Sequence, residues 1–207
     1  MPLPTQPPAR PDRRSVLRAA VVLAAALPLA ACASEDPLAA QAREGNNKNY
    51  IAGDGSVQEY DAGSRGESVA VTGTTYAGEA VDSATWGGQV TVLNFWYAAC
   101  APCRVEAPHM AELSREYADQ GVQFLGVNVR DEAATAAAFE RTFDVPYPSM
   151  PDKDGRVLLA MTKYVPPQAV PTTLVIDKQG RVAARILGVA EKSTLKAIIA
   201  DRVAETA

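Results

Sequence analysis

The chain has 207 residues, of which 47% are hydrophobic and 21% charged, so it has room for one packed domain with tails but not for two full domains. Acidic residues outnumber basic ones by 24 to 20, which gives a formal charge of −4. A chain of this charge lacks the basic surface of nucleic-acid-binding proteins, so we predict no nucleic-acid partner.

The first 31 residues are typical of an export signal. An apolar stretch at residues 19–31 is too short to span a membrane comfortably and follows four basic residues, Arg10, Arg13, Arg14 and Arg18. We therefore predict that residues 1–31 are a cleaved signal peptide. The Arg13-Arg14 pair fits a twin-arginine signal, but such pairs also occur in general secretory signals, so the export route stays open.

Cys32 follows directly after this apolar stretch. The segment Leu29-Ala30-Ala31-Cys32 resembles the lipobox of bacterial lipoproteins, in which the cysteine becomes the first mature residue and carries lipid. The alternative is an incidental small residue in a signal peptide. We predict lipid attachment at Cys32 and an extracytoplasmic protein anchored to the cell membrane. Loss of four arginines and one aspartate with the signal would leave a net charge near −7.

The mature chain begins with a segment that has little to bury. Residues 32–65 are rich in Gly, Asn, Asp, Ser and Glu and show no sustained periodicity, which predicts a flexible tether. The folded domain should then occupy residues 66–207. Its first part, residues 68–73 and 76–81, predicts an N-terminal β-hairpin. Residues 90–96 are almost continuously apolar, as in a central strand that is buried on both faces.

The rest of the domain alternates helices and strands. After a helix that ends near residue 119, we expect a strand at 122–129, helices at 132–143 and 156–164, a hairpin of strands 172–176 and 182–187, and a C-terminal helix at 192–203. This order predicts an α/β fold with a parallel βαβ unit.

Cys100 and Cys103 are the two thiols that remain once Cys32 is assigned to lipid. A cysteine at the N-terminal end of a helix has its thiolate stabilised by free backbone N–H groups, so Cys100 should be the nucleophile. Cys103 lies one turn further along and should be more shielded, and it should resolve the mixed disulfide. The sequence therefore predicts a redox-active disulfide that needs no cofactor.

Glu106 shares one face of the helix with Cys103. The spacing continues through Met110, Leu113 and Tyr117, which makes this face the buried one. An inward carboxylate at this place could accept the proton of Cys103 if burial raises its pKa. The spacing is equally compatible with a solvated glutamate near the positive end of the helix.

Other interpretations of the cysteine pair are weaker. Zinc needs about four ligands, and the chain offers one histidine and no second cysteine pair, so we predict no metal. A purely structural disulfide would be unusual across so short a loop. His109 lies off the Glu106 face and is more consistent with a surface residue than with a base.

Residues 94–108, NFWYAACAPCRVEAP, resemble the active-site segment of the extracytoplasmic thioredoxin-like proteins of the TlpA, ResA and cytochrome c biogenesis group. The resemblance covers about residues 66–207. It implies a thioredoxin-like fold, with a central mixed β-sheet flanked by helices, an N-terminal β-hairpin and a helical insert at 132–143.

The resemblance also implies functional roles for individual residues. The proline that matches Pro171 forms a cis peptide bond in this family and faces the disulfide, and the glutamate that matches Glu106 tunes the cysteines. The residues of the implied substrate groove are Trp96, Pro102, Val170, Pro171 and Thr172. Asn94 stands where cytoplasmic thioredoxins carry a buried acid, so an acid at this position cannot take part in proton transfer here. Two departures, Tyr97 and Ala99, leave the choice of partner open.

We predict a protein disulfide oxidoreductase that acts on protein thiols, most simply as a reductant of extracytoplasmic cysteines such as those of apocytochrome c, with a membrane redox partner. The alternative is an oxidant or exchanger for exported proteins, because the same residues serve both directions. A non-catalytic metal or haem chaperone is a third hypothesis, but no Cys/His/Met cluster lies beside the cysteine pair.

Overall fold

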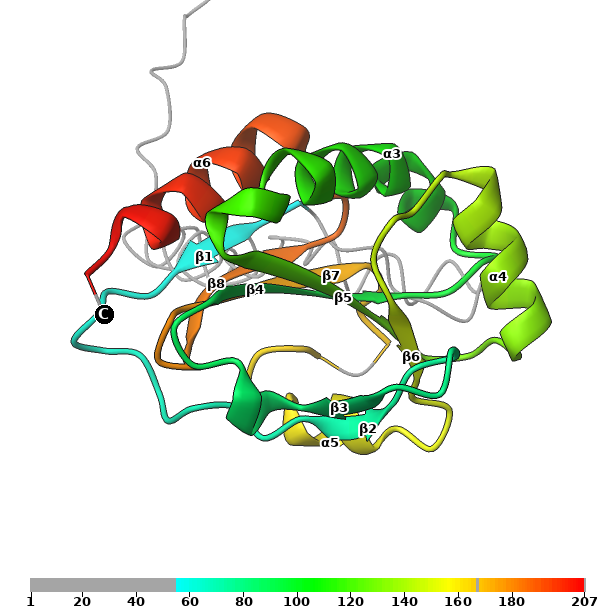
Figure 1. Ribbon diagram of the computed structural model, residues 1–207, viewed down its shortest axis with the longest axis horizontal. Coiled ribbons are helices and arrows are strands. Elements are labelled where there is room, and N and C mark those ends of the chain that lie inside the picture. The colour runs from blue at the N-terminus through cyan, green and yellow to red at the C-terminus, as the bar shows by residue number, and fades with distance from the viewer. Residues whose placement is uncertain (1–54, 167, 207) are drawn as a thin grey trace, which may run out of the picture. The chain divides into compact units, whose positions relative to one another are not determined.

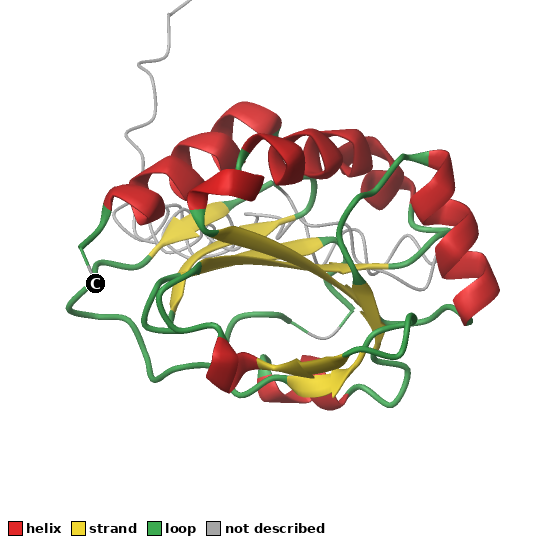
Figure 2. Cartoon of the chain, in the orientation of Figure 1, coloured by secondary structure: helices red, strands yellow, loops and turns green. Residues whose placement is uncertain are grey.

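The computed structural model describes residues 55–166 and 168–206. This part of the chain forms one six-stranded mixed sheet, in the order β1-β8-β7-β4-β5-β6, and a separate two-stranded hairpin (Figures 1 and 2). The strands of the sheet are β1 (Val57–Glu59), β4 (Val90–Trp96), β5 (Val122–Asn128), β6 (Ser149–Pro151), β7 (Thr172–Ile176) and β8 (Val182–Leu187). The hairpin consists of β2 (Thr72–Thr74) and β3 (Ala80–Asp82).

Four α-helices complete the described part: α3 (Ala101–Glu116), α4 (Ala133–Thr142), α5 (Arg156–Ala160) and α6 (Lys192–Ala204). Two short 3-10 helices lie at Ser83–Thr85 and Ala118–Gln120. The connection β4-α3-β5 joins two parallel strands, and β7 and β8 pair with their neighbours in the antiparallel sense. The predicted α/β fold with a central mixed sheet and flanking helices is confirmed.

β4 is the strand that organises both cores. All seven of its residues are buried, and it pairs with β5 on one side and β7 on the other. Alternate side chains enter different cores: Val92 packs with residues of α3 and α6, whereas Leu93 and Phe95 pack on the opposite face. A strand that is covered on both faces needs apolar residues at every position, which explains its continuous run.

The two faces of the sheet are covered by different elements. Helices α3 and α6 lie side by side over one face, and the hairpin β2–β3 lies with α5 over the other (Figure 1). The first core includes Met110, Leu113, Leu195 and Ile199, and the second includes Val71, Met150 and Val157. The amphipathic pattern of α3 follows directly from this arrangement.

The predicted boundaries hold best where the signal is local. β7 and β8 begin and end at the predicted residues, around a turn in which Gly180 has a φ of +78°. The alanine-rich helix is one residue shorter at each end than predicted. The predicted helix at 156–164 ends at Ala160 and continues as hydrogen-bonded turns. The strands of the N-terminal hairpin are shorter than predicted, because residues 75–79 form its turn.

The prediction of a flexible tether is wrong for residues 55–65. β1 pairs with β8 along the edge of the sheet, with Val57 opposite Ile186. The side chain of Arg65 is 1% exposed and donates to the carboxylates of Asp177 and Glu205. A three-residue strand and a lone arginine have no periodicity of their own, and their partners lie more than a hundred residues away in the chain. The folded domain therefore begins at or before residue 55.

The other N-terminal predictions lie outside the described residues. They are the signal peptide at 1–31, the lipid site at Cys32 and the remaining part of the tether. Within residues 55–166 and 168–206, no helix is long and apolar enough to cross a membrane.

Candidate active site

Cys100 and Cys103 form a disulfide at the N-terminus of α3. Cys100 is the N-cap residue, and its Sγ accepts a hydrogen bond from the backbone N–H of Cys103 at 3.2 Å. Pro102 occupies the first turn, where its missing N–H costs no helical hydrogen bond. The helix N-terminus thus directs a backbone donor and its positive dipole end at the sulfur of Cys100, which favours a thiolate there.

The two cysteines are buried to the same extent in this disulfide form. Cys100 is 0% exposed and Cys103 is 1% exposed. Both pack in an apolar cluster with Trp96, Tyr97 and Val170. The prediction that Cys103 is more shielded than Cys100 is therefore wrong for the disulfide. The nucleophilic role of Cys100 rests on its position as the helix cap and not on its exposure.

The segment before β7 faces the disulfide. The Val170–Pro171 peptide bond is cis, as the resemblance implies. The carbonyl oxygen of Val170 lies 3.8 Å from Cys100 Sγ. The hydroxyl of Thr172 donates to the carbonyl of Ala169 at 2.7 Å and holds the turn. Of the predicted groove residues, Trp96, Val170, Pro171 and Thr172 are buried and Pro102 is half-buried, so a substrate groove at these residues stays a prediction.

Glu106 lies one turn after Cys103 and is 1% exposed. Its Oε1 accepts a hydrogen bond from Asn94 Nδ2 at 2.7 Å, and its Oε2 accepts one from the backbone N–H of Ala190 at 2.8 Å. Burial raises the pKa of Glu106 to about 8, although the two hydrogen bonds oppose that shift. Both donors are neutral amides. The sequence allows either an inward carboxylate or a solvated glutamate at this position, and in the structure Glu106 is the inward carboxylate.

Asn94 has a function in this arrangement that the sequence did not predict. Its Nδ2 donates to both Glu106 Oε1 and, at 3.1 Å, to Thr173 Oγ1 on the neighbouring strand β7. Asn94 therefore orients the carboxylate instead of only replacing an acid. The signal that could have indicated it is a buried amide in an otherwise apolar strand, because such a group needs a partner.

A small cavity adjoins Cys103 and Glu106. Its volume of about 10 Å³ is close to the space that one water molecule needs. The polar residues on its wall are Asn94, Glu106, Tyr147 and Ser149. The apolar part of the wall includes Trp96 and Phe139, whose ring centroids are 4.4 Å apart. Sequence reasoning missed Tyr147 and Ser149, which lie within a proline-rich stretch without periodicity.

The loop before Cys100 is fixed by the loop after β5. The Oδ2 atom of Asp131 accepts hydrogen bonds from the backbone N–H of Ala98 at 2.6 Å and from Asn128 Nδ2 at 2.9 Å. The guanidinium of Arg130 lies 4.0 Å from the ring centroid of Tyr97. Neither Arg130 nor Asp131 carried a sequence signal, because the contact joins two loops of the chain that are about thirty residues apart.

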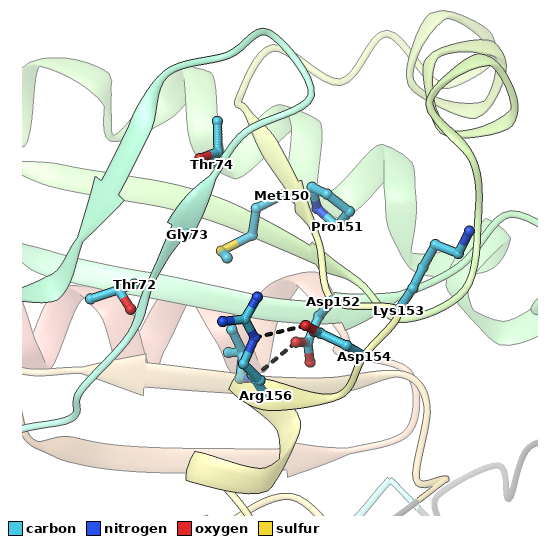
Figure 3. A pocket seen from close by; sticks show the side chains of 10 residues that line it. Thr72, Gly73, Thr74, Met150, Pro151, Asp152, Lys153, Asp154 and Arg156 are labelled. Carbon is cyan, nitrogen blue, oxygen red and sulfur yellow. Dashed lines mark hydrogen bonds and ion pairs between the residues drawn. The ribbon is translucent and has the colours of Figure 1, made fainter.

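A larger groove lies elsewhere, between β2 and the segment that links β6 to α5 (Figure 3). Its volume is about 540 Å³, and its wall includes Thr72, Met150, Lys153 and Arg156. The buried carboxylate of Asp152 accepts hydrogen bonds from the N–H groups of Val157 and Leu158. Neither cysteine lines this groove, so it is separate from the disulfide.

His109 is half-buried on α3 and lines neither cavity. The described part of the chain holds no group of three or more His, Cys, Asp or Glu side chains that could bind a metal ion. The chemically distinctive group of the described residues is therefore the disulfide together with Glu106.

A disulfide at the start of a helix, facing a cis-proline segment on a mixed sheet, defines a protein of the thioredoxin-like class. The chain belongs to the AhpC/TSA family, whose model matches residues 66–185. Two relatives are called thiol-disulfide oxidoreductase ResA. The one from Geobacillus thermodenitrificans is 38% identical over 109 residues, 53% of this chain and 60% of that protein. The one from Bacillus thuringiensis subsp. konkukian is 31% identical over 123 residues, 59% and 69% of the two chains. The resemblance to the ResA group is thus confirmed.

Solved structures agree with this classification. A secreted thiol-disulfide isomerase from Corynebacterium glutamicum has a TM-score of 0.65 and 30% identity, over 73% of this chain and 95% of that chain. A DsbF homologue from Corynebacterium diphtheriae has a TM-score of 0.62 and 32% identity, over 70% and 92%. The match covers only about 60% of the length of the first ResA relative. The activity of that relative can therefore not be assigned in full to this chain.

Proposed function

We propose that this protein exchanges thiols and disulfides with protein substrates outside the cytoplasm, through Cys100 and Cys103, and that it acts mainly as a reductant. Two lines support this proposal. Relatives in the same family bear the name thiol-disulfide oxidoreductase. The sulfur of Cys100 accepts the N–H of Cys103 at the helix N-terminus, which stabilises the thiolate that such exchange requires. The redox group is the disulfide itself, so no cofactor is needed.

The reaction has two steps. The thiolate of Cys100 attacks one sulfur of a substrate disulfide, and the other substrate sulfur leaves with the electron pair of the broken bond. The thiolate of Cys103 then attacks Cys100 Sγ, which forms the disulfide and releases the second substrate sulfur as a thiolate. The substrate gains two electrons, and the cysteine pair loses them.

The observation that carries the proposal is the placement of Glu106. Its carboxyl group lines the same small cavity as Cys103 and has only neutral partners. With a pKa of about 8 it exchanges a proton readily near neutral pH. In the forward direction the carboxylate accepts the proton of the Cys103 thiol. When a donor reduces the disulfide again, neutral Glu106 returns a proton to the departing sulfur of Cys103.

We infer that the substrates are proteins with exposed cysteine pairs, such as the haem-attachment cysteines of apocytochrome c, and that a membrane redox partner supplies the electrons. The resemblance of residues 94–108 supports this inference. A second function, oxidation or isomerisation of disulfides in exported proteins, is favoured by the similarity to the structure described as a secreted thiol-disulfide isomerase.

We also propose that the protein is a lipoprotein, anchored through Cys32 after removal of residues 1–31, with residues 33–54 as the link to the domain. The lipobox-like segment before Cys32 supports the anchor. Mass spectrometry of the protein from bacterial membranes should find a diacylglycerol mass at Cys32, and a mature chain that starts elsewhere would contradict the anchor.

The direction of electron flow is tested by the reduction potential of the cysteine pair. The chain is prepared with Cys32→Ser, so that two sulfurs titrate, and is equilibrated with dithiothreitol buffers. A potential near −270 mV, about that of thioredoxin, supports the reductant, and one near −120 mV supports the oxidant. A protein in which Cys100 and Cys103 do not cycle at all would exclude both.

A further inference from the structure

Ser149 Oγ on β6 and Glu140 Oε1 on α4 are buried, and neither makes a hydrogen bond of good geometry with another described residue. The Ser149 hydroxyl is nevertheless close enough to the Glu140 carboxyl group to lower its pKa. Buried polar groups are almost always paired, so each unpaired group asks for an explanation. Ser149 lines the small cavity that also holds Glu106 and Cys103. The thiol exchange described above uses neither Ser149 nor Glu140.

These groups lie close to the cysteines and to one another. Cys103, Glu106, Tyr147 and Ser149 share the wall of the cavity. Glu140 is half-buried, burial raises its pKa, and the nearby Ser149 hydroxyl opposes that shift. Burial raises the pKa of the Tyr147 hydroxyl, and the charges of Glu106 and Glu140 raise it further. Tyr147 is therefore near both acids.

The chain makes room for the Ser149 hydroxyl at one specific place. A Cβ atom on Gly126 of β5 would lie 2.3 Å from Ser149 Oγ and 2.7 Å from Trp96 Nε1. The absence of a side chain at residue 126 thus allows two polar groups to converge beside the cavity. The cavity has about the size of one water molecule, and its wall offers the donors and acceptors that a buried water needs.

Within the part of the chain that the structure describes, the hydrogen-bond partners of Glu106 offer its proton no path to solvent. Glu106 is 1% exposed, and its two described hydrogen-bond partners, Asn94 Nδ2 and the N–H of Ala190, both donate and cannot carry the proton away. With a pKa of about 8, Glu106 is mostly protonated at neutral pH, and this proton must leave before the carboxylate can accept the proton of Cys103.

We propose that Ser149 and Glu140, with a water molecule in the cavity, relay protons between Glu106 and solvent. This inference rests on the proposed thiol exchange. In the forward direction the carboxyl proton of Glu106 passes to the water, the water passes a proton to Ser149 Oγ, and the hydroxyl passes its own proton to the Glu140 carboxylate. Glu140 then releases the proton to bulk water. No electrons move in these transfers, and the reverse sequence returns a proton to Glu106. Ser149 and Glu140 act through Glu106 and are positioning residues.

The test separates the two chemical steps. The reduced full-length protein with Cys32→Ser is mixed with an aromatic disulfide that releases a coloured thiolate. The first release reports attack by Cys100, and the second reports ring closure by Cys103. We expect Glu140→Gln and Ser149→Ala to slow the second release about tenfold and to increase its solvent isotope effect, with the first release unchanged. Glu140→Asp, which keeps a carboxyl group, should restore most of the rate.

The matched control is Glu132→Gln, which removes an exposed carboxylate at the N-cap of the same helix and should change neither step. Equal slowing of both steps in Glu140→Gln would overturn the relay, and so would rates within about twofold of the starting protein. Glu140→Gln could also shift the pH dependence of the second release without lowering its maximal rate. That result would overturn the relay, because it would mean that Glu140 acts only through its charge. A starting protein that releases no second thiolate would instead refute the proposed thiol exchange.

Discussion

Two buried carboxylates lie at opposite ends of the sheet and have opposite protonation behaviour. Glu106 lies beside the disulfide, and Asp177 lies in the turn between β7 and β8; each is 1% exposed. Burial raises the pKa of Glu106 to about 8, because its partners are the neutral donors Asn94 and Ala190 N–H. Burial also pushes the pKa of Asp177 upward, but hydrogen bonds from Arg181 and Arg65 outweigh it and hold this pKa below its usual value.

The difference shows that burial alone does not decide the charge of a carboxylate. Asp177 Oδ2 accepts hydrogen bonds from Arg65 Nη1 and Arg181 Nε, each at 2.9 Å, so its negative charge is compensated. Glu106 has no such cation, so the neutral acid is favoured. One end of the domain thus keeps a fixed charge that ties the N-terminal segment to the C-terminal helix. The other end keeps an acid that titrates in the physiological range, as proton transfer requires.

The largest expected effect comes from removing the cation at the Asp177 end. Arg65→Met should lower the free energy of unfolding by about 4 kcal/mol, because the buried carboxylate of Asp177 keeps only Arg181 as a cation and Glu205 loses its two bonds to Arg65. Urea denaturation at neutral pH measures this loss. The matched control is Arg156→Met, whose ion pair with Asp154 is exposed and should contribute less than about 1 kcal/mol. Equal effects of the two substitutions would contradict the comparison.

The next effect is the pH dependence of stability. The folded disulfide form binds a proton at Glu106 up to about pH 8, whereas the unfolded chain loses it near 4.5. The folded state therefore binds more protons between these values, and the free energy of unfolding should fall by about 4 kcal/mol as the pH rises through this window. Glu106→Gln should remove most of the fall, and Glu140, whose pKa burial also raises, accounts for the remainder. A slope as steep in Glu106→Gln as in the starting protein would assign the effect to another group.

Asp177 gives stability the opposite pH dependence, because its pKa is lowered in the folded state. Its contribution to stability should be complete above the pKa of the unfolded aspartate and should be lost as the pH falls through the folded value. Asp177→Asn should remove this acid-side loss and leave the fall toward pH 8 unchanged. Thermal unfolding at a series of pH values measures both limbs in one experiment.

A smaller change sharpens the role of the neutral donors. Asn94→Leu removes the hydrogen bond to Glu106 Oε1 and should raise the pKa of Glu106 above 8, by about one unit. Titration of the side-chain carboxyl carbon by NMR measures this shift. Thr173→Val is the control, because it removes the other partner of Asn94 and leaves the bond to Glu106 in place. An unchanged pKa in Asn94→Leu would mean that the hydrogen bond from Asn94 does not influence the pKa of Glu106.

The smallest effect concerns the loop before Cys100. Asp131→Ala removes the acceptor of the Ala98 N–H and should cost about 1 kcal/mol of local stability. Hydrogen exchange at Ala98 should become faster, whereas Asp131→Asn keeps an acceptor oxygen and should preserve most of the protection. Equal exchange rates in the three proteins would show that this bond does not hold the loop.

The same contrast explains what could be predicted from the sequence. β4, the β7–β8 hairpin and the buried face of α3 follow from local periodicity, and they place Cys100, Cys103 and Glu106 correctly. The partners of Glu106 and Asp177 come from distant parts of the chain. Asn94 was interpreted only as a missing acid, and Arg65 was assigned to a tether, because a pairing across elements leaves no pattern in either segment. Ser149 and Glu140 were missed for the same reason.

The pKa of Glu106 in the disulfide form is the most direct test of the central claim, that a buried acid without a cation serves Cys103. Carbon-13 NMR titration of the glutamate carboxyl groups, with Glu106→Gln to assign the signal, gives this value. The structure predicts a midpoint of about 8 for Glu106, above those of the exposed glutamates. A midpoint near 4.5 would contradict the account, because the acid would then be ionised throughout the neutral range and could not return a proton to Cys103.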